Sequence, residues 1–123
     1  MGNMQSNGVV WIEIPVTNMD RAKAFYGKLL DAPLTDHEGG PNPMAMLPNG
    51  PQSAVSGHLY PGTPAVRGRG PTVHLAVSAD AESAMDRIAE GGGEVISPVI
   101  SIPSGSFFYA IDTEGNSLGV FHA

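Results

Sequence analysis

At 123 residues the chain is long enough for one domain with its own apolar core, and its hydrophobic content of 41% is typical of a globular protein. Its net charge of −6, with six Lys and Arg against twelve Asp and Glu, excludes the basic surface that nucleic acid or an anionic membrane requires. The absence of cysteine excludes disulfides, thiolate metal ligands and a cysteine nucleophile. With no long apolar run and no signal-peptide core, we expect a cytoplasmic protein.

The first half of the chain reads as a strand, a helix and three more strands. Residues 9–16 are an apolar run typical of a buried strand, and Thr17 or Asn18 can cap a helix over 19–30, where apolar residues recur at helical spacing. Turns rich in glycine and proline then separate three short strand candidates, at 34–38, 43–48 and 53–60.

The second half repeats this order after a loop over 61–71. A strand at 72–78 precedes a helix over 80–90, which the glycines at 91–93 end. Three further strands are expected at 94–102, 106–111 and 117–122. Aligning Ala22 with Ala84 gives a repeat offset of 62 residues, half of the chain. We therefore predict a single domain over 1–123 with two β-α-β-β-β modules, at about 9–60 and 72–122, joined by the linker 61–71.

Three segments resemble the vicinal oxygen chelate superfamily, which includes glyoxalase I, bleomycin-resistance proteins and extradiol dioxygenases. They are "IPVTNMDRAKAFYGKLL", "AESAMDRIAEGGGEV" and "DTEGNSLGVF", and the resemblance covers residues 9–122. It implies an α+β fold in which two βαβββ modules form curved mixed sheets around a cavity, with the helices outside. It also implies a homodimer and places the chain among the uncharacterised glyoxalase-related proteins.

The resemblance also implies four positions for metal ligands. In this sequence they fall on Trp11, Gly57, Thr72 and Gly119, and a slip of one residue in the fourth strand would replace Gly57 with His58. Tryptophan and glycine side chains cannot bind a metal, and threonine is a poor ligand for Zn²⁺, Ni²⁺ or Fe²⁺. We therefore expect no metal and no other cofactor. The alternative is a divalent metal at a displaced site.

Glu13 is a carboxylate in the middle of the first apolar strand, where desolvation is costly unless a partner compensates. Strand side chains alternate, so Glu13 shares a face with Trp11 and His74 shares one with Thr72. We expect Glu13 and His74 to meet at the cavity, either as a structural pair or as a catalytic pair that moves a proton. The displaced metal site would use these two residues together with His58.

The same alternation selects Trp11, Glu13, Thr72, His74 and Phe121 as residues that would contact a ligand. Phe108 is added to this set, although alternation leaves open which face each residue of "SFFYAI" takes. The function that we predict is a metal-free cavity protein that binds a small organic molecule. One alternative is a metal-dependent lyase (lactoylglutathione-lyase-like), isomerase or dioxygenase, and the other is a non-catalytic interaction protein with a collapsed cavity. The sequence leaves open whether the protein is an enzyme.

Overall fold

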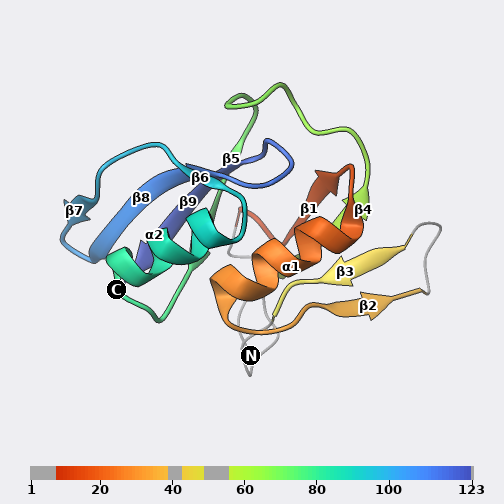
Figure 1. Cartoon of the computed structure of the whole chain (residues 1–123), viewed down its shortest axis with the longest axis horizontal. Coiled ribbons are helices and arrows are strands. Elements are labelled where there is room, and N and C mark those ends of the chain that lie inside the picture. Colours follow the sequence, from red (N-terminus) through yellow and green to blue (C-terminus); the bar gives the residue numbers. More distant parts are fainter. Residues whose placement is uncertain (1–7, 39–42, 49–55, 123) are drawn as a thin grey trace.

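A computed structural model of the chain describes residues 8–38, 43–48 and 56–122. Its two helices and nine strands confirm the predicted α+β class with two mixed sheets (Figure 1). The first half contains β1 (Trp11–Val16), α1 (Met19–Leu30), β2 (Thr35–His37), β3 (Met44–Met46) and β4 (Ser56–Pro61). The second half contains β5 (Thr72–Ala76), α2 (Ala81–Glu90), β6 (Glu94–Val95), β7 (Ile100–Ile102), β8 (Gly105–Ile111) and β9 (Ser117–His122). Among the described helices, none is long and apolar enough to cross a membrane.

Both sheets have the same topology. The strand order of the first sheet is β1-β4-β3-β2, and that of the second is β5-β9-β8-β6, with β7 also paired to β8. In each sheet the first strand runs parallel to the last, and the other pairs are antiparallel. Strands β1 and β5 therefore lie at the edges of their sheets, which positions them to border the space between the two modules.

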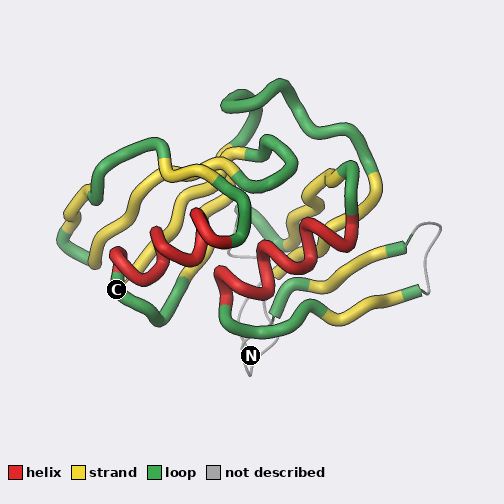
Figure 2. The backbone as a smooth tube through the Cα atoms, in the orientation of Figure 1, coloured by secondary structure: helices red, strands yellow, loops and turns green. Residues whose placement is uncertain are grey.

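Each helix begins at a side-chain cap. The Asn18 side chain accepts a hydrogen bond from the Arg21 backbone N–H (3.0 Å), and Asp80 does the same for Ser83 (2.8 Å). Helix α1 ends at Asp31, whose left-handed backbone (φ 54°) stops the helix. The two helices contact each other and lie in front of the sheets (Figure 2).

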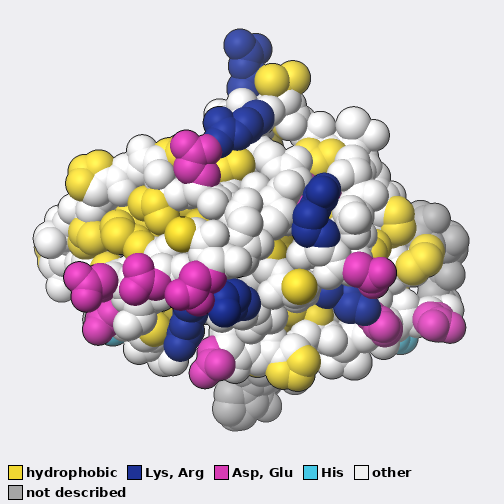
Figure 3. Space-filling model, viewed as in Figure 1, with side chains coloured by type: hydrophobic (Ala, Val, Ile, Leu, Met, Phe, Trp, Pro, Cys, Tyr) yellow, Lys and Arg dark blue, Asp and Glu magenta, His cyan; other side chains and the backbone are white. Residues whose placement is uncertain are grey.

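One face of each sheet packs against the helices and forms the core. The alternation is clear in β1, where Ile14 and Val16 are buried while Trp11 and Glu13 on the opposite face are exposed. The largest fully buried side chains of the core are Tyr26, Phe25, Phe108, Leu29, Leu59, Ile88, Leu118, Val16 and Val120. On the helix side of the surface, Asp and Glu side chains are interspersed with Lys and Arg (Figure 3).

The single strand expected over 94–102 is two short strands, β6 and β7. The backbone leaves the ladder at Ser97, whose hydroxyl accepts a hydrogen bond from the Tyr109 backbone N–H (2.8 Å), and Pro98 follows with no N–H to donate. Residues 53–55 of the expected fourth strand lie outside the described residues, and β4 begins at Ser56.

A buried carboxylate in the β8–β9 turn connects the second module to the start of α1. One oxygen of Glu114 accepts hydrogen bonds from the backbone N–H groups of Thr17 (3.0 Å) and Asn18 (3.1 Å) and from the Thr17 hydroxyl (2.8 Å). The other accepts from Arg21 Nε (2.7 Å) and the Thr113 hydroxyl (2.8 Å). Chiefly because of the hydrogen bond from Arg21, the pKa of Glu114 is lowered to about 2.

A second polar connection surrounds Asp112, which is also buried. Its carboxylate accepts a hydrogen bond from the Tyr26 hydroxyl (2.5 Å) and from Asn116 Nδ2 (3.0 Å). The same Asn116 amide donates to the backbone oxygen of Pro15 in β1 (2.9 Å). Burial, together with the neighbouring carboxylate, raises the pKa of Tyr26 well above its usual value. These contacts hold the second module against the C-terminal end of β1.

Candidate functional site

A cavity of about 640 Å³ lies between the edge strands of the two sheets. Its walls come from β1, the end of α1, the end of β3, the start of β4 and the whole of β5. The residues that line it are Val9, Ile12, Leu30, Leu47, Pro48, Ser56, Pro71, Thr72, Val73, His74, Leu75 and Ala76. Its volume is within the range of sites that hold small organic molecules.

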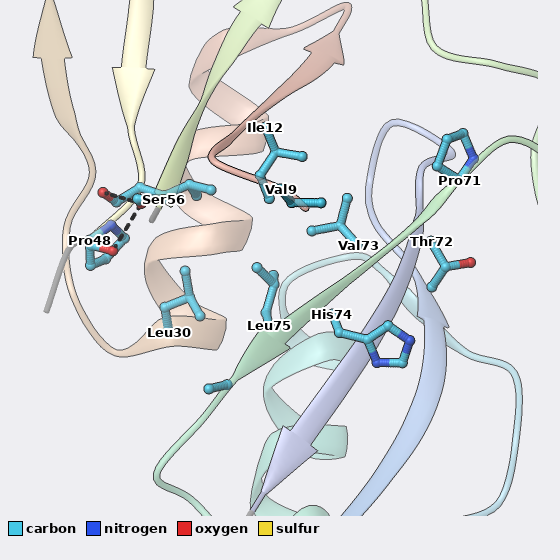
Figure 4. A pocket seen from close by; sticks show the side chains of 12 residues that line it. Val9, Ile12, Leu30, Pro48, Ser56, Pro71, Thr72, Val73, His74 and Leu75 are labelled. Carbon is cyan, nitrogen blue, oxygen red and sulfur yellow. Dashed lines mark hydrogen bonds between the residues drawn. The ribbon is translucent and has the colours of Figure 1, made fainter. Parts of the chain in front are cut away.

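The interior of this cavity is apolar on the side of the helices. Five apolar side chains from both modules project into the same space (Figure 4): Leu30, Leu75, Val73, Val9 and Ile12. Thr72 and His74 lie on the opposite side of β5, where their polar groups border the cavity rather than fill it (Figure 4). This arrangement suits a ligand with an apolar body and a small number of polar groups.

A hydrogen-bonded cluster occupies the face of the first sheet that points away from the helices, which we call its open face. Trp11 Nε1–H donates to His58 Nδ1 (2.9 Å), and His58 Nε2 lies 3.7 Å from Glu13 Oε1. Because an indole N–H can only donate, His58 Nδ1 is an acceptor and the neutral imidazole carries its proton on Nε2. The His58 side chain is 10% exposed and Glu13 is 64% exposed, so the carboxylate is the solvent-facing end of the cluster.

An aromatic cluster occupies the corresponding face of the second sheet. The His74 ring packs edge-on against Phe107 and Tyr109, with centroid separations of 5.6 and 5.9 Å. The ring lies over Gly119, where a Cβ atom would be only 2.2 Å from His74 Nδ1. Gly119 is therefore required for the position of this ring.

The prediction that Glu13 is buried and pairs with His74 is wrong. In the register of β1 with β4, Glu13 lies opposite His58, and the two side chains meet on the same face of one sheet. His74 belongs to the other sheet, and its contacts are aromatic. Adjacent strands of one sheet bring side chains closer than two edges separated by a cavity do.

The face expected for Phe108 is also wrong, because this side chain is 1% exposed in the core beneath the helices. Phe107 and Tyr109 take the open face instead. The sequence contained a signal for this, since the turn over 112–116 sets the hairpin register that places Phe107 opposite Phe121. Phe121 is half-buried on that same face, as its position in the strand predicts.

The contributions of Val9, Leu30 and Leu47 to the cavity were missed. Nothing in the local pattern identifies them, because a helix end and a strand end become cavity walls only when the two modules pack together. Of the predicted ligand-contacting residues, Thr72 and His74 line the cavity.

The residues at the implied metal positions do not fit a metal. Gly57 faces the helix side, where a Cβ would meet the Ile12 backbone oxygen at 2.3 Å, and at Gly119 the His74 ring occupies the space of a side chain. Trp11 uses its only polar group to hold His58. Within residues 8–38, 43–48 and 56–122, no three His, Asp or Glu side chains are grouped closely enough to bind a metal ion.

Comparison with known proteins gives one consistent family. A sequence model of the Glyoxalase/Bleomycin resistance protein/Dioxygenase superfamily matches residues 8–120. The chain is 30% identical over 120 residues to "Putative glyoxylase CFP32" of Mycobacterium tuberculosis (strain CDC 1551 / Oshkosh), a match that covers 92% of this chain and 44% of that protein. The same values hold for its counterpart in Mycobacterium bovis. The chain thus spans less than half the length of these relatives.

Solved structures show the same fold at low sequence identity. A glyoxalase/bleomycin resistance protein from Albidiferax ferrireducens T118 matches with a TM-score of 0.70 and 18% identity, covering 95% of this chain and all of that one. A glyoxalase-related enzyme from Fulvimarina pelagi matches with a TM-score of 0.67 and 16% identity, covering 95% and 88%. A glyoxalase I variant from Zea mays matches with a TM-score of 0.70 and 15% identity, covering 92% of this chain and 45% of that one.

Proposed function

The chain belongs to the Glyoxalase/Bleomycin resistance protein/Dioxygenase superfamily, and on that premise we propose that it binds a small organic molecule without the metal of its metal-dependent relatives. The observation that supports this proposal best is the cavity of about 640 Å³ between β1 and β5, lined by apolar side chains from both modules. A cavity of this size can enclose most of a drug-sized ligand.

The polar groups near the cavity support binding rather than metal chemistry. On the first sheet the hydrogen bond from Trp11 occupies His58 Nδ1, and on the second sheet the polar side chains of Thr72 and His74 border the cavity. Such groups orient a ligand by hydrogen bonds while the apolar walls supply most of the affinity. The proposal also includes a homodimer in the cytoplasm, and light scattering on the purified protein tests its oligomeric state.

Binding of an apolar dye tests the proposal directly. Nile red, which is uncharged and has no N–H group, is expected to bind with enhanced fluorescence and to raise the melting temperature. Val9→Trp, which places a large side chain at the cavity wall, should weaken this binding at least about tenfold. The matched control is Val66→Trp, because Val66 is 70% exposed in the linker and does not line the cavity.

Two results would contradict the proposal. One is that the protein binds no Nile red, or that both tryptophan variants bind it as the unaltered chain does. The other is that the purified protein contains one equivalent of a transition metal per chain and loses dye binding when a chelator removes it.

A further inference from the structure

The backbone of β5, and not only its side chains, lines the cavity. All six residues from Pro71 to Ala76 are part of the wall, although consecutive side chains of a strand point to opposite faces. A continuous run of this kind means that the cavity lies along the edge of the strand. Within the described part of the chain, β5 pairs only with β9, so its other edge presents backbone N–H and C=O groups to the cavity.

A hydrogen bond at the end of β5 shows which backbone groups of the strand face the cavity. The Val77 backbone N–H donates to the Phe121 oxygen (2.9 Å), which shows that the odd-numbered residues of this strand bond to β9. The backbone groups of the even-numbered residues, Thr72, His74 and Ala76, therefore point away from β9 and toward the cavity. All three residues are exposed.

The first module shows that such an edge accepts hydrogen bonds from outside its own sheet. In β1 the Val16 oxygen accepts from the Gly62 backbone N–H (3.0 Å), so the even-numbered residues bond to β4 and the odd-numbered ones face outward. On that outward edge the Pro15 oxygen accepts from the Asn116 side-chain amide of the second module (2.9 Å). An amide is thus already bound at the equivalent edge.

We propose that the ligand is an extended peptide, or a molecule with a peptide-like chain of amides, that adds as a strand along the edge of β5 opposite β9. The inference rests on the proposed function, since it names the class of molecule that the cavity holds. Strand addition takes its affinity from backbone hydrogen bonds and its specificity from pockets for alternate side chains. Here one such pocket is the apolar group of Leu30, Leu75 and Ile12.

The site also defines the length and charge of this peptide. An edge of three outward-facing residues pairs with a segment of about four or five residues, at about 3.3 Å per residue. Glu13 is exposed on the neighbouring sheet, and the chain carries a net charge of −6. We therefore infer an apolar segment without acidic side chains, and with a basic residue or a free amino group at one end.

The test uses the peptide acetyl-Val-Leu-Val-Lys-amide and two versions of it, N-methylated at the odd or at the even residues. We expect the parent to bind, and one N-methylated version to bind at least about fivefold more weakly because it lacks the N–H groups that face β5. Ala76→Pro removes one outward N–H, and Pro15 in the equivalent position of β1 shows that this geometry accepts proline. The matched control, Ala76→Val, adds similar bulk but keeps the N–H.

Ala76→Pro is expected to weaken binding of the peptide about fivefold relative to Ala76→Val. Equal affinity for the peptide in the two variants would overturn the inference, as would equal affinity of the unaltered chain for all three peptides. The comparison of the three peptides uses the unaltered chain only, so it tests the inference even if Ala76→Pro fails to fold. If the unaltered chain binds Nile red but none of the peptides, the inference alone is overturned. If it binds neither the dye nor a peptide, the proposed function is overturned as well.

Discussion

Replacing Glu114 with glutamine is expected to lower the free energy of unfolding at pH 7 by about 2–3 kcal/mol. The side chain is fully buried, and both carboxylate oxygens accept hydrogen bonds from residues of α1 and from its cap. Glutamine has the same shape, but it lacks the charge and presents an NH₂ group to donors. The change therefore removes the attraction to Arg21 and leaves one of two sets of donors without an acceptor, either the backbone N–H groups of Thr17 and Asn18 or Arg21 Nε and the Thr113 hydroxyl.

The magnitude follows from the pKa of Glu114, which is lowered from 4.5 to about 2. Each pKa unit corresponds to about 1.4 kcal/mol, so the shift sets an upper limit of about 3.5 kcal/mol. The Arg21 side chain is 50% exposed, and water screens its charge, which reduces the expected value. Because the folded-state pKa lies below the unfolded one, this stabilisation is complete above about pH 5 and is lost as the pH falls toward 2.

Urea denaturation at pH 7, 5 and 3 measures the effect. The difference in unfolding free energy between the unaltered chain and Glu114→Gln should be equal at pH 7 and 5 and should shrink by about 2 kcal/mol at pH 3. Glu90→Gln is the matched control, because Glu90 pairs with Lys28 (3.1 Å) on the surface and is 64% exposed, so its loss should change stability by less than about 1 kcal/mol. Equal effects of the two substitutions, or a difference that does not depend on pH, would refute the reasoning.

Two further predictions concern the open faces of the sheets. Gly119→Ala should destabilise the protein by about 1–3 kcal/mol because its Cβ would collide with the His74 ring, and most of this loss should disappear in the His74→Ala background in a double-mutant cycle of denaturation measurements. Additive effects would show that the glycine serves another purpose. Trp11→Phe should release His58 from its single tautomer, so that ¹⁵N chemical shifts report a mixture of Nδ1–H and Nε2–H forms at neutral pH. An unchanged spectrum would mean that Trp11 does not set the tautomer.

The helices and most strands were predictable because their signals are local. Helix α1 occupies the predicted range 19–30, since its cap at Asn18 and its apolar spacing both lie within the segment itself. The strand expected over 94–102 was divided by Ser97, whose hydroxyl bonds to a strand that comes later in the chain. Such a competing acceptor is invisible until the hairpin partner has been placed.

The site was harder to predict, because its contacts depend on register and on packing between modules. The alternation of side chains correctly placed Trp11 and Glu13 on the same face, but it could not say which neighbour Glu13 would meet. That choice depended on a single residue of register in β4, where a shift by one position exchanges Gly57 for His58 on the open face. The structure places His58 there, and the polar cluster follows from that register.

Each sheet has a pair of residues directly opposite one another on neighbouring strands, here called a rung, and the two rungs are equivalent in position but differ in chemistry. Glu13 lies opposite His58, and His74 lies opposite Gly119, with the same separation of 61 positions between the two rungs in both strands. The first rung has two polar side chains, of which Trp11 holds His58, whereas the second has one ring lying on a glycine. Adding a second imidazole to the second rung, as in Gly119→His, would drive the new ring into His74, so this substitution would not build a metal site here.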